Sequence, residues 1–335
     1  MLLESEAVSP TVAALAATPN GKGKPAPLAL EIADDPCWAI LTASGQIART
    51  ANQDPLAESG PRSRHDVFRS VVKTSARGEI AAVTSLGRML RLQVMDMPML
   101  PPMSGLPNLT GGVPAKDFIT LLKGESLVAF APLDTVLAIG TAQGVVKRVQ
   151  PDYPLNREDW EVIALKDKDT VVGVEPAGSD DVDLVFVTRQ AQLLRFSAAA
   201  VRPQGRTAGG MAGIKLADGD QVLFFGAVAP GDDAAVVVTV SGTEGALPGT
   251  APGAGKVTAF AEYPAKGRAT AGVRAHRFLK GEDILLVAWA GHGPAKASSL
   301  GGVARSLPQE HGRRDGSGIP LSQAVDVIGP SMTWA

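Results

Sequence analysis

The sequence is poor in cysteine and in long hydrophobic runs. Its one cysteine, Cys37, excludes an internal disulfide and favours a reducing compartment. Apolar runs such as 127–130 and 234–238 are far shorter than the roughly 20 residues that a transmembrane helix needs. The amino end carries Glu4 and Glu6 where a secretory signal carries Lys or Arg. We therefore expect a cytoplasmic protein.

Motifs for metal or cofactor binding are also missing. The four histidines, His65, His276, His292 and His311, have no cysteine or paired carboxylate at metal-ligand spacing. There is no P-loop and no dinucleotide-binding fingerprint, and the Asp-rich turns lack the spacing of a calcium loop. Aromatic residues make up only 4%, which argues against base stacking. We predict no metal and no cofactor in this chain.

Charge and composition narrow the class of protein further. The formal net charge is -2, which does not by itself indicate nucleic-acid binding, although basic residues gathered on one face would suffice. The 37 glycines and 25 prolines argue against a helical bundle, because both residues destabilise helices. We expect a turn-rich, all-β chain.

A short pattern recurs along the chain. A β-rich run ends in Thr or Ser, followed by two residues, a turn residue that is usually Gly, three more residues and a basic residue. Five copies occupy residues 42–49, 84–91, 141–148, 188–195 and 298–305. A further copy starts at Thr239 and diverges after Gly242 into a Gly/Pro-rich insertion up to Gly255. The pattern predicts six β-hairpins whose tight turns need a residue of positive φ.

The spacing of these hairpins predicts a propeller. Successive copies begin 42 to 59 residues apart, which is the size of a four-stranded blade. Polar, acidic turns that each precede an apolar run reinforce the period, and they lie at 122–125, 165–169, 216–220 and 279–283. Six blades closing into a disc would leave only short sheet edges. Because the fifth unit departs from the pattern, an open or spiral disc is the alternative.

Two loops repeat a third pattern. Gly205-Arg206 and Gly267-Arg268 each stand five residues before another glycine, counted from the first glycine. Such loops bring a basic side chain close to a backbone that a ligand can approach, which suits a phosphate group.

These repeats resemble a known family. The string VRPQGRTAGGMAGIKL at 201–216, with GVVKR at 144–148 and FVT at 186–188, is similar to the repeat of the carboxy-terminal domain of the A subunits of bacterial DNA gyrase and topoisomerase IV. The resemblance extends over roughly residues 28–330 and recurs in at least five of the six units.

The resemblance implies a six-bladed β-pinwheel, a propeller-like disc whose blades exchange strands and whose outer rim binds and bends double-stranded DNA. In that family the disc follows a DNA-cleaving core with a catalytic tyrosine, and it works with a separate ATPase subunit, the B-type partner. Tyr153 and Tyr263 lie in blade-like segments without an Arg-Tyr-Thr stretch. We assign no catalytic residue, and the chain resembles the accessory part, cut from the enzyme or encoded apart from it, and associated with the nucleoid.

One departure from the family concerns wrapping. Discs that wrap DNA carry a Gln-Arg-Arg-Gly-Gly-Lys-Gly-like box in the first blade, and the comparable stretch here is Glu58-Ser-Gly-Pro-Arg-Ser-Arg-His-Asp66. It keeps basic residues but loses the paired glycines and the lysine. The resemblance therefore leaves both a topoisomerase IV-like and a divergent gyrase-like domain open, with bending favoured over full wrapping.

The resemblance makes one basic residue per blade, with further basic loop residues, the candidates for phosphate contact. They are Arg49, Arg62, Arg64, Arg69, Lys73, Arg91, Lys147, Arg148, Arg195, Arg202, Arg206, Lys266, Arg268, Arg274, Arg305, Arg313 and Arg314. Two other interpretations stay open: these are strand ends paired with nearby Asp or Glu, or the disc is a protein-interaction propeller that uses its acidic turns.

We expect three segments in the chain. Residues 1–27, with the stretch NGKGKP at 20–25, are predicted to be a tether that in the family joins the disc to the cleavage core. The disc is predicted over 28–330, and 331–335 form a short tail.

Overall fold

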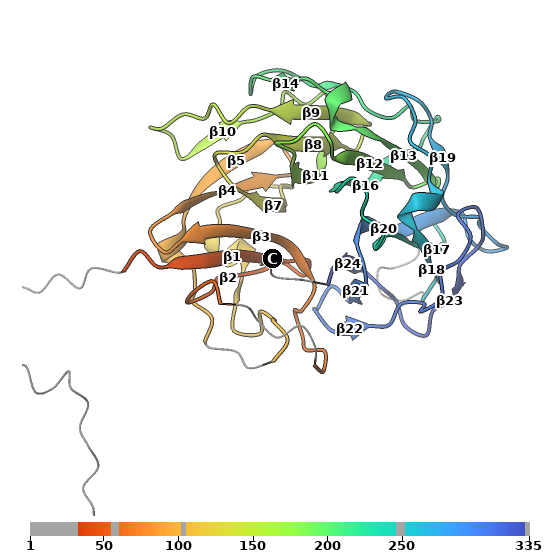
Figure 1. Ribbon diagram of the computed structural model, residues 1–335, viewed down its shortest axis with the longest axis horizontal. Helices are drawn as coiled ribbons and strands as arrows, with labels where there is room; N and C mark the ends of the chain where they lie inside the picture. The colour runs from red at the N-terminus through yellow and green to blue at the C-terminus, as the bar shows by residue number, and fades with distance from the viewer. Residues whose placement is uncertain (1–32, 55–59, 102–104, 246–251, 332–335) are drawn as a thin grey trace, which may run out of the picture. The chain divides into compact units, whose positions relative to one another are not determined.

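The computed structural model describes residues 33–54, 60–101, 105–245 and 252–331. Six small sheets stand in a ring, which confirms the predicted six-bladed, propeller-like all-β fold (Figure 1). Helix is limited in these ranges to the 3-10 turns η2 (Val94–Asp96), η3 (Ala198–Ala200) and η4 (Phe260–Glu262) and to α1 (Ala115–Phe118). The predicted tether at 1–27 and all of the predicted tail except Ser331 lie outside the described residues.

Each blade is built from the centre of the ring outward. The innermost strands are β3 (Phe68–Ser75), β7 (Leu127–Ala131), β11 (Val171–Pro176), β16 (Val222–Val228), β20 (Ile284–His292) and β24 (Val327–Pro330). Next come β1 (Pro36–Thr42), β4 (Glu79–Thr84), β8 (Leu137–Thr141), β12 (Asp183–Thr188), β17 (Ala235–Gly242) and β21 (Ala295–Ser298). The third strands are β2 (Gln46–Arg49), β5 (Arg88–Gln93), β9 (Val145–Val149), β13 (Gln192–Ser197), β18 (Ala254–Ala259) and β22 (Ala304–Arg305).

The outermost strands come from the following repeat. They are β6 (Val113–Pro114), β10 (Asp159–Glu161), β14 (Pro203–Gln204) with β15 (Met211–Ala212), β19 (Val273–Arg274) and β23 (Ile319–Pro320), which complete blades 1 to 5 in that order. Figure 1 shows β10, β14, β19 and β23 on the outside of the ring. The rim is therefore made of short segments that are exchanged between neighbouring repeats.

The sequence forms this arrangement because its apolar runs are short and buried on both faces. In β8 and β12 every residue except Asp183 is buried, and the hydrophobic clusters join residues of neighbouring blades, such as Val83 of blade 2 with Leu137 of blade 3. The core therefore lies between the blades. The innermost strands surround a central cavity of about 370 Å³.

The predicted hairpin turns are present, with two shifts. In four units the turn residue donates its N–H to the Thr carbonyl three residues earlier at 3.0 Å, and its φ is positive; these residues are Gly45, Gly87, Gly144 and Ala191. In the sixth unit the turn is formed by Ser299 and Gly302, one residue later than the pattern places it. In the fifth, β17 runs through Gly242, and the returning strand starts at Ala254 after a turn glycine, Gly253.

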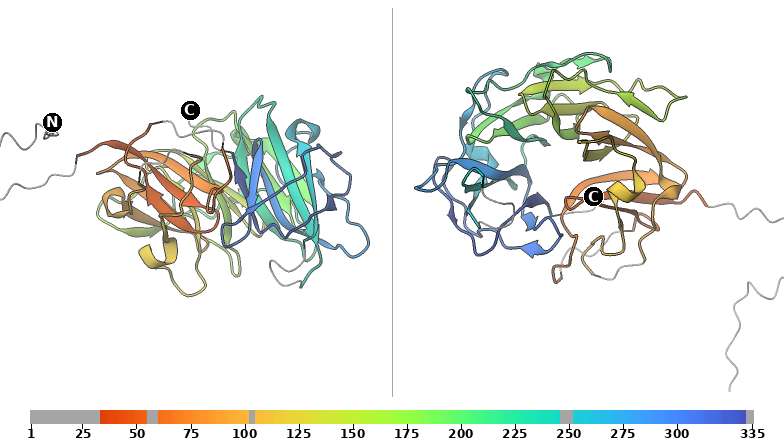
Figure 2. Two further views of the ribbon diagram at one scale, coloured as in Figure 1. Left: turned by 90° about the horizontal axis from the view of Figure 1, so that it is seen from below. Right: turned by 180° about the vertical axis from the view of Figure 1, so that it is seen from behind.

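The ring closes in the described residues. In blades 1 to 5 the carbonyl of the turn residue accepts the N–H of the residue that follows the exchanged strand, for example Gly144 from Gly213 at 2.7 Å. In blade 6 the same carbonyl, that of Gly302, accepts the N–H of His65 from blade 1 at 2.9 Å. Strands β24 and β3 lie side by side at this junction (Figure 2). The open or spiral alternative is therefore wrong for this structure.

Candidate nucleic-acid interface

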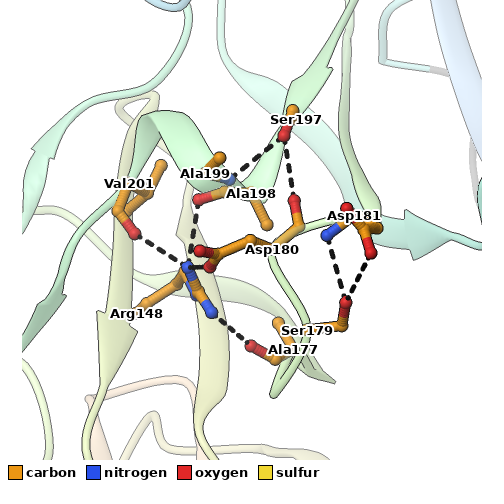
Figure 3. Close-up of polar contacts among 9 residues, drawn as sticks. All are labelled: Arg148, Ala177, Ser179, Asp180, Asp181, Ser197, Ala198, Ala199 and Val201. Carbon is orange, nitrogen blue, oxygen red and sulfur yellow. Dashed lines mark hydrogen bonds and ion pairs between the residues drawn. The ribbon is translucent and has the colours of Figure 1, made fainter.

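The repeated strand-end arginines are built into the fold. Arg148 of β9 is 2% exposed, and its guanidinium donates to the carbonyls of Ala177 at 2.9 Å, Ala198 at 3.2 Å and Val201 at 3.3 Å. It also pairs with Asp180 at 2.5 Å. Figure 3 shows the guanidinium enclosed by these groups. Arg148 therefore fixes the end of blade 3 to the next repeat.

Other arginines of this position are partly enclosed in the same way. Arg91 pairs with Glu79 and lies over the ring of Trp160, 5.3 Å from its centroid. Arg195 lies over the ring of Phe260 at 4.6 Å. The Nε atoms of Arg49, Arg91, Arg148 and Arg195 are buried, and Nε of Arg305 donates to the carbonyl of Ala324. These guanidinium groups are thus partly enclosed by their own chain, and a DNA contact by Arg49, Arg91, Arg195 or Arg305 stays a prediction.

Lys147 is buried as well. Its side chain is 0% exposed, and its ammonium donates to the carbonyls of Val162 at 2.6 Å, Arg206 at 2.7 Å and Ala208 at 2.8 Å. An ammonium has three N–H donors, so all of them are used within the chain. Lys147 and Arg148 are both buried and bonded to their own chain, which argues against the predicted DNA contact by either side chain.

Basic residues of the first blade donate hydrogen bonds to the sixth blade. Arg62 pairs with Asp66 and donates to the carbonyl of Ala297 at 2.9 Å, and Arg64 donates to the carbonyl of Gly301 at 2.9 Å. Both side chains are nevertheless partly exposed. The segment that corresponds to the family's box thus helps to close the ring, while its residues 58 and 59 lie outside the described ranges.

A surface rich in positive charge lies on the rim of blades 3 and 4. It consists of two loops, 201–216 and 264–277, that we call the basic arc. Together they carry seven basic residues and no Asp or Glu: Arg202, Arg206, Lys215, Lys266, Arg268, Arg274 and Arg277. All seven are exposed or half-exposed. The arc therefore concentrates positive charge although the whole chain has a formal net charge of -2.

The two loops of the basic arc are bonded to each other. Ala269 donates its N–H to the carbonyl of Gly213 at 2.7 Å, and Lys215 donates its N–H to the carbonyl of Thr270 at 3.0 Å. The side chain of Arg268 donates to the carbonyl of Ala212. Because of these bonds the loops form one continuous surface across two blades.

Three basic residues were missed in the sequence. Lys215 and Arg277 belong to the basic arc, and Arg157 lines a groove of about 310 Å³ together with Arg206 at the boundary of blades 2 and 3. The absence of acidic residues from 201–216 and 264–277 would have identified the first two. Arg157 is surrounded by acidic residues in the sequence, so no local signal marks it.

The remaining candidates lie away from the basic arc. Arg69 and Lys73 are on β3, the innermost strand of blade 1; Arg69 lines the central cavity, where burial lowers the pKa of its guanidinium. Arg313 and Arg314 are on the rim of blade 5 next to Asp315, whose carboxylate is 3.7 Å from Arg313. A DNA contact by these four residues stays a prediction.

The acidic turns are used inside the molecule. Asp169, Asp220 and Asp283 accept backbone N–H groups from Gln143 at 2.9 Å, Gln190 at 3.0 Å and Glu244 at 2.7 Å respectively. Glu125 in blade 2 is bonded to Thr84 and Arg88. These carboxylates cap turns, which weakens the alternative in which acidic turns recruit a protein partner.

The described residues contain no group of three or more His, Cys, Asp or Glu side chains that could hold a metal ion. No helix in the same ranges has the length and apolar character that crossing a membrane requires.

Comparisons with known proteins agree with this fold. Residues 183–229 and 250–288 match the family model of the DNA gyrase C-terminal domain, beta-propeller. The chain superposes on the C-terminal domain of DNA topoisomerase IV with a TM-score of 0.68 at 18% identity, covering 89% of this chain and 93% of the other. The DNA gyrase A C-terminal domain gives a TM-score of 0.58 at 16% identity, covering 88% and 99%.

Relatives in sequence are much longer than this chain. The topoisomerase subunit TopoM of Mycolicibacterium smegmatis is 44% identical over 117 residues, which are 35% of this chain and 14% of that protein. The DNA gyrase A subunit of Escherichia coli is 29% identical over 218 residues, 62% of this chain and 22% of that protein. The chain thus spans less than a quarter of the length of these two relatives.

Proposed function

We propose, from the chain's confirmed resemblance to the C-terminal propeller domain of bacterial type IIA topoisomerase A subunits, that it binds and bends duplex DNA on the rim of its disc. It would act as the non-catalytic accessory domain of an ATP-dependent topoisomerase, on the nucleoid, beside a cleavage core and an ATPase subunit. The proposal concerns the domain's contribution to DNA topology, and it assigns strand cleavage to the cleavage core.

The basic arc carries this proposal. Phosphate affinity depends on Lys and Arg collected on one surface, and the arc gathers seven of them without an acidic residue. Arg202, Lys266 and Arg274 are exposed, and their side chains have no hydrogen-bond or ion-pair partner among the described residues. Their charges are therefore available to an external anion.

Bending follows from where the arc lies. Because it runs across two adjacent blades on the outside of a ring, a duplex that contacts all of it must follow a convex surface. Bending a duplex of 20–30 base pairs by 40–90° costs about 1–6 kcal/mol, and the additional phosphate contacts offset that cost. Phosphate contacts fix position without reading base edges, so we expect little sequence preference.

The salt dependence of binding tests the proposal. A labelled duplex of about 40 base pairs is titrated at several salt concentrations, and log affinity should fall linearly with log salt. Replacing Arg202, Lys266 and Arg274 with Ala should lower the slope by about 2.7, since each lost phosphate contact removes about 0.9. Absence of binding by the unaltered protein even at low salt would refute the proposal.

A charge-matched variant controls for the change in net charge. Lys123, Lys166 and Lys280 are exposed and lie in the acidic turns, away from the arc. Replacing these three with Ala removes the same charge and should leave the salt slope within experimental error of the original. If both triple variants bind alike, the arc is not the contact surface.

A further inference from the structure

Two buried lysines occupy equivalent places in blades 3 and 5. Lys147 pairs with Ile139 of β8 and Lys256 pairs with Thr239 of β17, and each stands three residues after the positive-φ glycine of its hairpin. Lys147 is 0% exposed and Lys256 is 3% exposed. The fifth repeat, which diverges in sequence, thus keeps this one basic position.

Both ammonium groups bind backbone carbonyls of arginine-bearing rim loops. Lys147 is bonded to the carbonyl of Arg206 itself and to that of Ala208, at 2.7 and 2.8 Å. Lys256 is bonded to the carbonyls of Arg313 at 3.0 Å, Arg314 at 2.6 Å and Gly316 at 3.0 Å. In both cases at least one bonded carbonyl belongs to an arginine of the rim loop: Arg313 is exposed, and Arg206 and Arg314 are half-exposed.

Each lysine also reaches the neighbouring blade. Lys147 donates to the carbonyl of Val162, the residue that completes blade 2, and Lys256 donates to that of Ala275, the residue that completes blade 4, both at 2.6 Å. The rim loop is thereby tied to the adjacent sheet. A loop rich in glycine would otherwise sample many backbone conformations, and ordering it on binding would weaken the complex.

Blade 4 shows that the fold does not require this lysine. Its equivalent residue is Leu194, three residues after Ala191, and its rim loop around Arg268 is held instead by bonds to Gly213 and Ala212. A buried ammonium is costly unless its hydrogen bonds are satisfied, and an apolar residue is the cheaper choice. The lysines therefore serve something other than the packing of the blade.

We propose that Lys147 and Lys256 are positioning residues that hold the rim loops of blades 3 and 5 so that Arg206, Arg313 and Arg314 meet DNA phosphates without a rearrangement. This inference rests on the proposed DNA binding. Burial lowers the pKa of both lysines to about 8, so at neutral pH both remain charged and bonded.

A double-mutant cycle tests the coupling between Lys147 and Arg206. Lys147→Met, Arg206→Ala and the double variant are titrated with the same duplex, after folding is verified and the folded fraction measured. Each single change should weaken binding by about threefold to tenfold and lower the salt slope by about 1. In the Lys147→Met background the Arg206→Ala change should cost less than about twofold, because the arginine is no longer held in place.

Two matched changes separate positioning from general destabilisation. Arg202 is not among the residues whose carbonyls Lys147 binds. Arg202→Ala should therefore weaken DNA binding equally in the unaltered protein and in Lys147→Met. Leu194→Met, at the same position in blade 4, should leave affinity unchanged. Additive effects of Lys147→Met and Arg206→Ala, or unchanged binding by folded Lys147→Met, would overturn the inference while leaving the proposed function intact.

The equivalent lysine of blade 5 provides a second test in case the Lys147 variant does not fold. If Lys147→Met does not fold, Lys147→Leu copies the natural residue of blade 4, and the cycle of Lys256→Met with Arg313→Ala measures the same coupling in blade 5. Failure of the unaltered protein to bind DNA would instead refute the proposed function, and the inference with it, so the two failures give different results.

Discussion

At the scale of single residues, arginines that look alike in the sequence have different roles. Arg148 lies at the end of β9 and Arg202 lies in a rim loop of the next repeat, yet one is buried and the other exposed. The difference arises because Ala177, Ala198 and Val201, which surround Arg148, come from the next repeat. The sequence could therefore predict that basic residues gather in the rim loops, but not which of them remain free.

This difference predicts opposite results for two substitutions. Arg148→Met removes a donor from three buried carbonyls, of which only that of Ala198 keeps another, the N–H of Val201, so it should lower the free energy of unfolding by about 2–4 kcal/mol. Arg202→Met, an exposed change, should stay within about 0.5 kcal/mol but weaken DNA binding. Urea denaturation and DNA titration measure the two effects. Equal stability of the two variants would contradict the assignment of Arg148 as part of the fold.

A second residue, Glu125, predicts a pH dependence of stability. Its side chain is fully buried, and hydrogen bonds from Arg88 lower its pKa from 4.5 to about 2. A carboxyl with a lower pKa in the folded state stabilises the fold above its unfolded pKa, and this contribution is lost as the pH falls from about 4.5 towards 2.

The variant Glu125→Gln should lose about 2 kcal/mol at pH 7 and show a flatter decline of stability between pH 5 and about 2. Thermal or urea denaturation across this range measures it. Exposed Glu310→Gln, whose side chain has no partner among the described residues, should reproduce the decline of the unaltered protein. A Glu125→Gln curve parallel to that control would show that Arg88 does not stabilise the charged carboxylate.

At the scale of elements, hairpins are predictable and exchanged strands are not. A turn such as that at Gly144 is encoded within a few residues, by a short buried run, a Thr and a residue of positive φ. Strands β14, β15 and β19 have two residues each, and their pairing depends on a neighbouring repeat. A two-residue strand has no hydrophobic period, so only the resemblance to a strand-exchanging family predicted it.

Two turn glycines predict how the exchanged strand constrains the hairpin. Gly144 and Gly124 share a φ of +79°, but a Cβ on Gly144 would lie 2.8 Å from the carbonyl oxygen of Ile214, whereas Gly124 has no atom within 4 Å. Gly124→Ala should cost about 1 kcal/mol, from backbone strain alone. Gly144→Ala should cost at least about 1 kcal/mol more, because the backbone after β15 must move. Equal losses in urea denaturation would show that the contact is easily relieved.

At the scale of the whole molecule, the ring is closed by residues of the segment that corresponds to the basic box of DNA-wrapping discs. Arg62 and Arg64 donate to carbonyls of blade 6, and His65 completes its outer edge. The basic arc meanwhile covers the rim of two of the six blades. The structure thus gathers exposed basic residues on two blades and gives no continuous basic path around the disc within the described residues.

The limited extent of the basic arc predicts a particular effect on DNA topology. If the contact is confined to the arc, the domain should speed the cyclisation of short duplexes, because bending brings the ends together. Nicked circles ligated in its presence should show little or no positive change in linking number, since a stable chiral wrap needs contact over most of the rim. A strong positive change would mean that other basic residues extend the path. The variant Arg313→Ala with Arg314→Ala would then decide whether the rim of blade 5 does so: if it does, the positive change should disappear, whereas the faster cyclisation from the arc should remain.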